Sequence, residues 1–212
     1  MKLFIVITLA LCMPSCRNIK EQTETSVHAV ETIKNESAPT VHEVNQDSVL
    51  LETTKQVLTA IKNKDYTTLA SYIHPVSGIR FSPYAYIDTV RDITLKSEKF
   101  PEEVSKHDVL IWGNYDGSGD TIRLSIDNYF KKFVYDHDFL NAEKTSLNKI
   151  TGKGNSTNNL EEVYSGCVFT ESYFSGFDKK FEGMDWESLR LVYKKYGARY
   201  FLVGIVHDQW TI

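Results

Sequence analysis

The chain has 212 residues, 42% of them hydrophobic, and carries 24 lysines and arginines against 28 aspartates and glutamates, a formal net charge of −4. Without a basic excess the protein cannot neutralise many phosphates, so nucleic acid is excluded as an expected partner. The three cysteines are too few for a disulfide framework, so the fold must depend on its hydrophobic core.

The first residues predict where the protein resides. Lys2 and the apolar run that follows it have the form of a secretory signal peptide over residues 1–15. The small residue Ser15 before Cys16 is similar to the lipobox of bacterial lipoproteins, and ordinary cleavage with secretion is the alternative. We therefore expect a lipid anchor on Cys16, which places the protein on the extracytoplasmic side of the bacterial cell envelope. Lipidation would leave Cys167 as the one cysteine free in the mature chain, with no intrachain disulfide possible.

Residues 16–47 are predicted to be a flexible tether. They contain no aromatic residue and no sustained hydrophobic period, whereas 25 of the 26 aromatic residues of the chain follow Asp65. A single α+β domain is expected over residues 48–212.

Two helices are predicted to open that domain. Asp47 or Ser48 can cap a helix whose apolar residues recur at helical spacing up to Ile61. Asp65 can cap a shorter second helix, which Pro75 stops.

The middle of the chain mixes short extended and helical patterns. Residues 79–81 and 84–87 are candidate strands separated by a proline, and residues 97–109 favour a helix. Ser125 can cap an amphipathic helix that ends near Val134. A polar loop over 152–159 then precedes a strand predicted for 167–174.

The end of the chain predicts a long antiparallel hairpin. Apolar and polar residues alternate over 189–194 and again over 201–206, with a turn at Tyr196–Ala198 between them. Alternation puts His207 on the face of Val203 and Ile205, and puts Trp210 on the face of Leu202 and Val206.

Five segments carry a resemblance to known proteins. They are similar to a group of uncharacterised bacterial secreted proteins, and they read IHPVSGIRFSPYAYID (73–88), WGNYDGSGD (112–120), YFKKFVYDHDF (129–139), GMDWESLRLVY (183–193) and YFLVGIVHDQWTI (200–212). The order of elements also resembles the cystatin-like cone of nuclear-transport-factor-2-like and SnoaL-like domains. The resemblance implies an α+β fold in which helices pack on a curved antiparallel sheet that ends in the C-terminal hairpin. That superfamily includes enzymes, ligand binders and association modules, so the fold does not decide the function.

The candidate site is a cavity between the sheet and the helices. His207 is predicted to face it together with two tyrosines of an earlier strand, and an acid–base role would need a carboxylate such as Asp136 beside a cavity histidine. The candidate pocket residues are His74, Arg80, Tyr84, Tyr86, Asp136, His137 and His207.

Other motifs carry no site. Residues 114–120 half match a calcium loop, but Ser125 stands where the bidentate glutamate is needed, and the glycines are better explained by a tight turn. Cys167 is expected to lie in a strand, as a small hydrophobe rather than a nucleophile. No spacing typical of a zinc site occurs. We expect no cofactor and no metal.

The sequence therefore favours a non-catalytic binding or interaction module, tethered to the envelope, for a small molecule, a glycan or a protein. The alternative is a SnoaL-like enzyme that uses a histidine–aspartate pair on a small molecule. A third possibility is a self-associating domain that forms a homodimer through an exposed sheet face.

Overall fold

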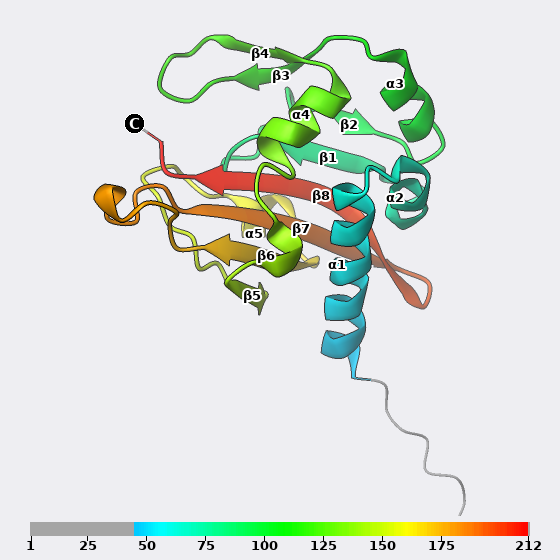
Figure 1. The fold of residues 1–212 in the computed structure, drawn as a ribbon. Helices are drawn as coiled ribbons and strands as arrows, with labels where there is room; N and C mark the ends of the chain where they lie inside the picture. The colour runs from blue at the N-terminus through cyan, green and yellow to red at the C-terminus, as the bar shows by residue number, and fades with distance from the viewer. Residues whose placement is uncertain (1–44, 212) are drawn as a thin grey trace, which may run out of the picture. The chain divides into compact units, whose positions relative to one another are not determined.

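The computed structural model describes residues 45–211 (Figure 1). The expected signal peptide, Cys16 and most of the expected tether lie outside the described residues. Within residues 45–211, no helix has both the length and the apolar character needed to cross a membrane.

The described part is an α+β domain, as expected. Its helical segments are α1 (Gln46–Lys62), α2 (Tyr66–Tyr72), α3 (Phe100–Lys106), α4 (Ile126–Phe133), α5 (Leu160–Val163), and the short 3₁₀ turns η1 (Phe139–Asn141) and η2 (Lys179–Phe181). Its strands are β1 (Ile79–Ser82), β2 (Thr94–Leu95), β3 (Leu110–Asn114), β4 (Thr121–Leu124), β5 (Lys144–Leu147), β6 (Val168–Phe174), β7 (Glu187–Tyr196) and β8 (Arg199–Gln209).

The helix starts follow from their capping residues. Asp65 accepts from the amide of Thr68 at the start of α2, and Ser125 accepts from the amide of Asn128 at the start of α4, as predicted. Helix α1 begins earlier than predicted, because the Asn45 side chain accepts from the amides of Asp47 and Ser48.

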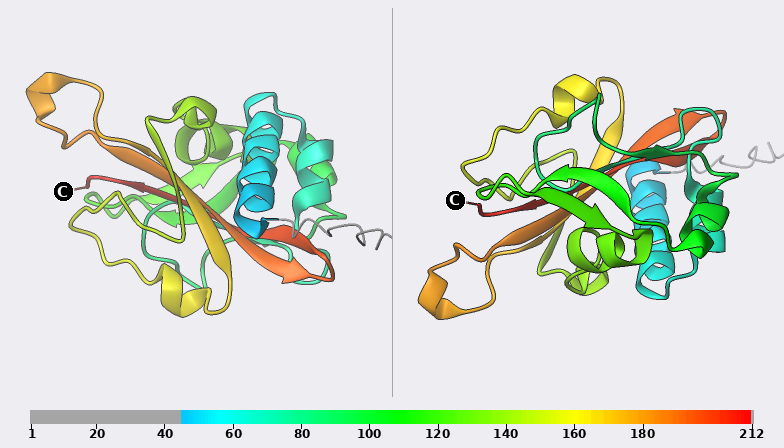
Figure 2. Two further views of the ribbon diagram at one scale, coloured as in Figure 1. Left: turned by 90° about the horizontal axis from the view of Figure 1, so that it is seen from below. Right: turned by 90° about the horizontal axis from the view of Figure 1, so that it is seen from above.

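Six strands of the described chain form one sheet in the order β2-β1-β8-β7-β6-β5, and β3 pairs with β4 in a separate hairpin. Neighbouring strands of the large sheet are antiparallel except β1 and β8, which run parallel. The predicted C-terminal hairpin is confirmed, since β7 and β8 pair from Glu187–Gln209 to Tyr196–Arg199. Figure 2 shows that the sheet is strongly twisted and that η2 projects at one end of it.

The sheet has two covered faces. On the helix face, which carries Leu189, Leu191 and Ile205, side chains of α1, α2 and α4 complete the main core. On the loop face, which carries Val192 and Val206, a smaller core forms against Leu160 of α5. Figure 1 shows α1 and α4 in front of the sheet and α5 behind it. The described domain therefore buries both sides of its central strands.

A β-bulge changes the alternation that the sequence predicted for β8. The register shifts between the pairs Val192–Gly204 and Tyr193–Leu202, which leaves Val203 without an opposite residue. Val203 joins the loop-face core, whereas Ile205 belongs to the helix-face core. The prediction that Val203 shares a face with Ile205 and His207 is therefore wrong for Val203.

Two further predictions fail near this end of the sheet. Residues 84–87 form no strand, because the chain bends after Pro83 and leaves the sheet. Trp210 lies beyond the end of β8 and is 38% exposed, so it is not the buried ring that strict alternation implied.

Candidate functional site

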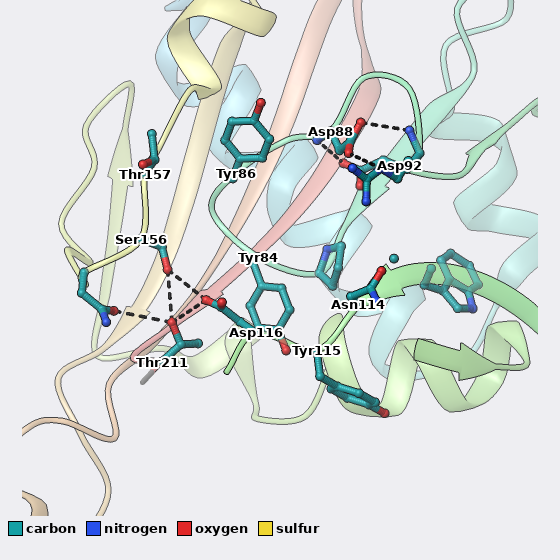
Figure 3. A pocket seen from close by; sticks show the side chains of 15 residues that line it. Tyr84, Tyr86, Asp88, Asp92, Asn114, Tyr115, Asp116, Ser156, Thr157 and Thr211 are labelled. Atoms are coloured by element: carbon teal, nitrogen blue, oxygen red, sulfur yellow. Dashed lines mark hydrogen bonds and ion pairs between the residues drawn. The ribbon is translucent and has the colours of Figure 1, made fainter. Parts of the chain in front are cut away.

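A cavity of about 490 Å³ opens beside the C-terminal end of β8 (Figure 3). Four segments build it: the connection after β1, strand β3 with its turn, the loop before α5, and the chain after β8. The lining residues are Pro83, Tyr84, Tyr86, Asp88, Arg91, Asp92, Trp112, Gly113, Asn114, Tyr115, Asp116, Asn155, Ser156, Thr157 and Thr211.

Aromatic rings form one part of the lining. Phe133 of α4 holds two of them, since its ring centroid lies 5.7 Å from that of Tyr84 and 6.2 Å from that of Tyr115. Tyr86 is 55% exposed and projects without such support. Each of these rings presents an apolar face together with a hydroxyl group, which suits a ligand that is partly apolar and partly hydrogen-bonding.

Hydroxyl and carboxylate groups form another part of the lining. Thr211 Oγ1 donates to Asp116 Oδ2 over 2.7 Å, and Ser156 Oγ lies 3.3 Å from the same oxygen (Figure 3). The two hydroxyls are themselves 3.1 Å apart. This triangle joins the β3–β4 turn, the loop before α5 and the end of the chain.

The remaining carboxylates of the cavity are already engaged. Asp88 lies 3.1 Å from Arg91 Nε, and amide donors from Arg91 and Val90 hold its pKa below the usual range. Asp92 accepts from Ser82 Oγ and from the amide of Asp88, but burial raises its pKa to about 6. Each carboxylate of the cavity is therefore held by hydrogen bonds, and Asp88 is also paired with Arg91.

Arg80 supports the cavity from behind. Its Nη1 donates to the carbonyl oxygens of Asp88, Thr89 and Asp92 over 3.4, 3.1 and 3.3 Å. Arg80 thus holds the connection that lines the cavity. The expectation that Arg80 is itself a lining residue is wrong.

His207 does not line the cavity, contrary to expectation, because it is fully buried behind the carbonyl group of the lining residue Pro83. Asp136 is not a lining residue either. The Nδ1 atom of His207 is 3.3 Å from the carbonyl oxygen of Pro83, and its ring packs edge-on against Phe133. Its Nε2 is 3.2 Å from Asp136 Oδ2, the kind of pair that the alternative enzyme hypothesis requires, although the histidine lies outside the cavity lining. Burial opposes ionisation of the imidazole, but the bond to Asp136 and its charge raise the pKa of His207.

Glu187 extends this pair into a cluster that sequence reasoning missed. Burial and the nearby Asp136 carboxylate raise the pKa of Glu187 to about 8. His137 Nδ1 lies 2.5 Å from Glu187 Oε2, and the His137 ring stacks on Phe177 with centroids 3.9 Å apart. His137 therefore contacts Glu187 and not the cavity. Glu187 begins β7, where nothing in the local sequence sets it apart.

His74 does not join the cavity, contrary to expectation. It follows α2, where its Nδ1 accepts from the amides of Val76 and Ser77. Its ring packs edge-on against Tyr196 and Phe201 at the far end of the hairpin. His74 is a structural residue that closes a turn.

The calcium-like segment is a hairpin turn. Gly117 and Gly119 have φ of 85° and 74°, the positive values that the sequence analysis anticipated. Asn114 Nδ2 donates to the carbonyl oxygen of Gly119, while Asp116 is directed to Thr211. The polar segment 114–120, which the sequence analysis noted as a partial calcium-loop pattern, thus supplies two lining residues, Asn114 and Asp116. No sequence motif marks the other polar lining residues, which are Asn155, Ser156, Thr157 and Thr211.

Comparisons with known proteins concern only the fold. No family model matches the chain, and no curated protein matches it either. Among solved structures, an NTF2-like protein from Cytophaga hutchinsonii is similar over 78% of this chain and 98% of its own, with 13% identity and a TM-score of 0.38. A Xanthomonas campestris protein described as a calcium/calmodulin-dependent protein kinase II association domain is similar over 83% of this chain and 92% of its own, with 13% identity and a TM-score of 0.29. Neither likeness is close enough to carry a ligand or a residue role to this chain.

Proposed function

We propose that this protein is a non-catalytic binding module, and that its cavity holds a neutral polyhydroxylated ligand such as the end of a glycan chain. The observation that carries the proposal is the lining itself. Three tyrosine rings together with amide and hydroxyl groups line a cavity of about 490 Å³, which lies within the range of small-ligand sites.

The three aspartates of the lining, of which Asp88 is paired with an arginine, disfavour an anionic ligand. Asp88 is paired with Arg91, Asp116 accepts from Thr211, and Asp92 is held by Ser82. A sugar hydroxyl both donates and accepts, and the same is true of the amide and hydroxyl side chains of Asn155 and Thr157.

Binding can be tested on a panel of immobilised saccharides, followed by calorimetry with the best ligand. We expect Tyr86→Ala to weaken the affinity at least about tenfold, equivalent to about 1.4 kcal/mol, because the exposed ring would lose its contact with the ligand. Thr157→Val should also weaken binding, since it removes a hydroxyl group and almost no volume.

Tyr196→Ala is the matched control, because Tyr196 is a half-exposed tyrosine outside the cavity lining. It should bind like the parent protein. If no saccharide binds, or if the Tyr86 and Thr157 variants retain full affinity, the cavity is not a glycan site.

One observation favours an acid–base enzyme instead, namely the 3.2 Å separation of His207 Nε2 and Asp136 Oδ2. A general base must come within hydrogen-bond distance of the proton that it removes. His207 is fully buried, and both of its ring nitrogens already face acceptors. The geometry therefore supports binding better than catalysis.

The proposal includes anchoring of the module to the envelope through lipid on Cys16, supported by the short apolar run that ends at Ser15. In a bacterial host, the parent chain should incorporate a labelled fatty acid, and Cys16→Ala should give unlabelled precursor. Equal labelling of the two chains would contradict the anchor.

A further inference from the structure

Three segments that are distant in the sequence bring a histidine and two carboxylates together beneath the cavity. Asp136 lies between α4 and η1, Glu187 begins β7, and His207 lies near the end of β8. One nitrogen or oxygen atom from each side chain lies within 4.8 Å of the corresponding atoms of the other two. His207 is fully buried, whereas the side chains of Asp136 and Glu187 are 17% and 15% exposed.

The imidazole is oriented as a metal ligand would be. Its Nδ1 faces the carbonyl oxygen of Pro83, and an N–H there donates to that oxygen. Metal-ligating histidines commonly donate one ring N–H to a backbone carbonyl or a carboxylate, which fixes the ring and directs the other nitrogen to the ion. Here the other nitrogen, Nε2, faces Asp136.

At this point Asp136 faces the imidazole of His207, and Glu187 faces the imidazole of His137. Asp136 Oδ1 is buried and accepts no hydrogen bond from an N–H or hydroxyl group of the described residues. The Glu187 carboxyl group beside it can donate only when it is protonated. Two adjacent carboxylates at a partly buried position repel each other unless a proton or a cation lies between them.

We propose that His207 Nε2, Asp136 and Glu187 bind one Zn²⁺ ion. In a tetrahedral zinc site with bonds of about 2.0–2.1 Å, two ligand atoms are roughly 3.3 Å apart, and the observed separation of Nε2 and Oδ2 is 3.2 Å. Once the ion has displaced the acidic protons of the cluster, a neutral imidazole and two carboxylates balance the charge of a divalent ion. The imidazole favours zinc over magnesium or calcium, which prefer oxygen ligands only.

His137 is the outer partner of this site. Its Nδ1 is 2.5 Å from Glu187 Oε2, so it can fix the orientation of that carboxylate. A bound ion would join the connection after α4 to β7 and β8, directly under Pro83 and the cavity. The inference does not depend on what the cavity binds.

The test uses the full chain without a metal-binding tag, stripped with a chelator and titrated with ZnCl₂ by calorimetry. We expect one ion per chain at this site, a rise in melting temperature with zinc, and no comparable rise with MgCl₂. Glu187→Gln and Asp136→Asn should each weaken zinc binding at least about tenfold, and His137→Gln about tenfold as an outer-partner variant.

The matched control is His107→Gln. His107 Nδ1 lies 3.3 Å from Asp127 Oδ2 in another histidine–aspartate pair, which is exposed and lacks a second carboxylate. This variant should bind zinc like the parent chain. Circular dichroism and the melting transition show whether each variant is folded, and Glu187→Gln keeps the test decisive if a change at buried His207 prevents folding. Absence of stoichiometric zinc binding, or unchanged affinity in folded Glu187→Gln and Asp136→Asn, would overturn the site.

Discussion

Replacing Arg190 with methionine should lower the free energy of unfolding by about 3–5 kcal/mol, the cost of removing one partner from a buried ion pair. Arg190 is fully buried on the loop face, where its Nε donates to Glu171 Oε1 over 2.9 Å and its Nη2 to Asp208 Oδ2 over 2.8 Å. Without the guanidinium group, two carboxylates would remain buried with no cation between them.

The neighbouring backbone adds to this effect. Arg190 Nη2 also donates to the carbonyl oxygen of Gly152 over 3.1 Å, and Glu171 accepts from the amides of Thr151 and Gly152. The cluster therefore fastens the loop before α5, which carries Ser156 and Thr157 of the cavity. Arg190→Met should loosen this loop as well as destabilise the sheet.

Urea unfolding followed by fluorescence measures the change. Lys106→Met is the control, because Lys106 pairs with Glu102 and Glu103 on the exposed surface and should contribute less than about 1 kcal/mol. Adding Glu171→Gln and Asp208→Asn to Arg190→Met should recover part of the lost stability, since no uncompensated charge would remain. A single variant within about 1 kcal/mol of the parent would show that the cluster is not what holds this face.

The same cluster shows why part of the fold could not be predicted. Alternation along β7 correctly put Leu189 and Leu191 on the core face, but it left Arg190 on the side expected to be polar. That side is covered by the loop before α5, and Glu171 and Asp208 arrive from β6 and β8. Burial of a charged residue depends on distant partners, which alternation within one strand does not reveal.

The sequence predicted correctly those features that depend on interactions between residues close together in the chain. Asp65 and Ser125 cap their helices as expected, because a side-chain oxygen needs only amides two or three residues away. The bulge at Val203 and the bend at 84–87 were missed, since each depends on what the neighbouring chain permits.

The sequence predicted some residues of the candidate site and missed others. Tyr84 and Tyr86 line the cavity, and His207 lies beside Asp136. Glu187 and Thr211 reach their partners only through strand pairing and the course of the chain end. No spacing of histidines or carboxylates in the sequence marked the cluster, because its members are separated by 51 and 20 residues, from 136 to 187 and from 187 to 207.

Replacing Trp112 with alanine should cost about 3–5 kcal/mol of stability, as expected for deletion of a large buried ring. The Trp112 ring is almost fully buried and stacks on Tyr129 of α4 with centroids 3.8 Å apart. It also packs edge-on against Phe81 of β1 at 5.8 Å, so it joins the β3–β4 hairpin to both α4 and the large sheet.

Two companion variants separate the contributions of this ring. Trp112→Phe keeps an aromatic ring but removes the Nε1–H that donates to the carbonyl oxygen of Leu124 over 2.9 Å, so it should cost less than the alanine variant. Ile111→Ala changes the preceding residue of β3, whose side chain is exposed, and should stay within about 1 kcal/mol of the parent. Thermal and urea unfolding of the three variants give the order in which they lower the free energy of unfolding.

Because Trp112 also lines the cavity, the alanine variant should lose ligand affinity along with stability, whereas Ile111→Ala should lose neither. Equal small costs for Trp112→Ala and Ile111→Ala would mean that the hairpin is not anchored through this ring, and the wall of the cavity that it forms would need another support.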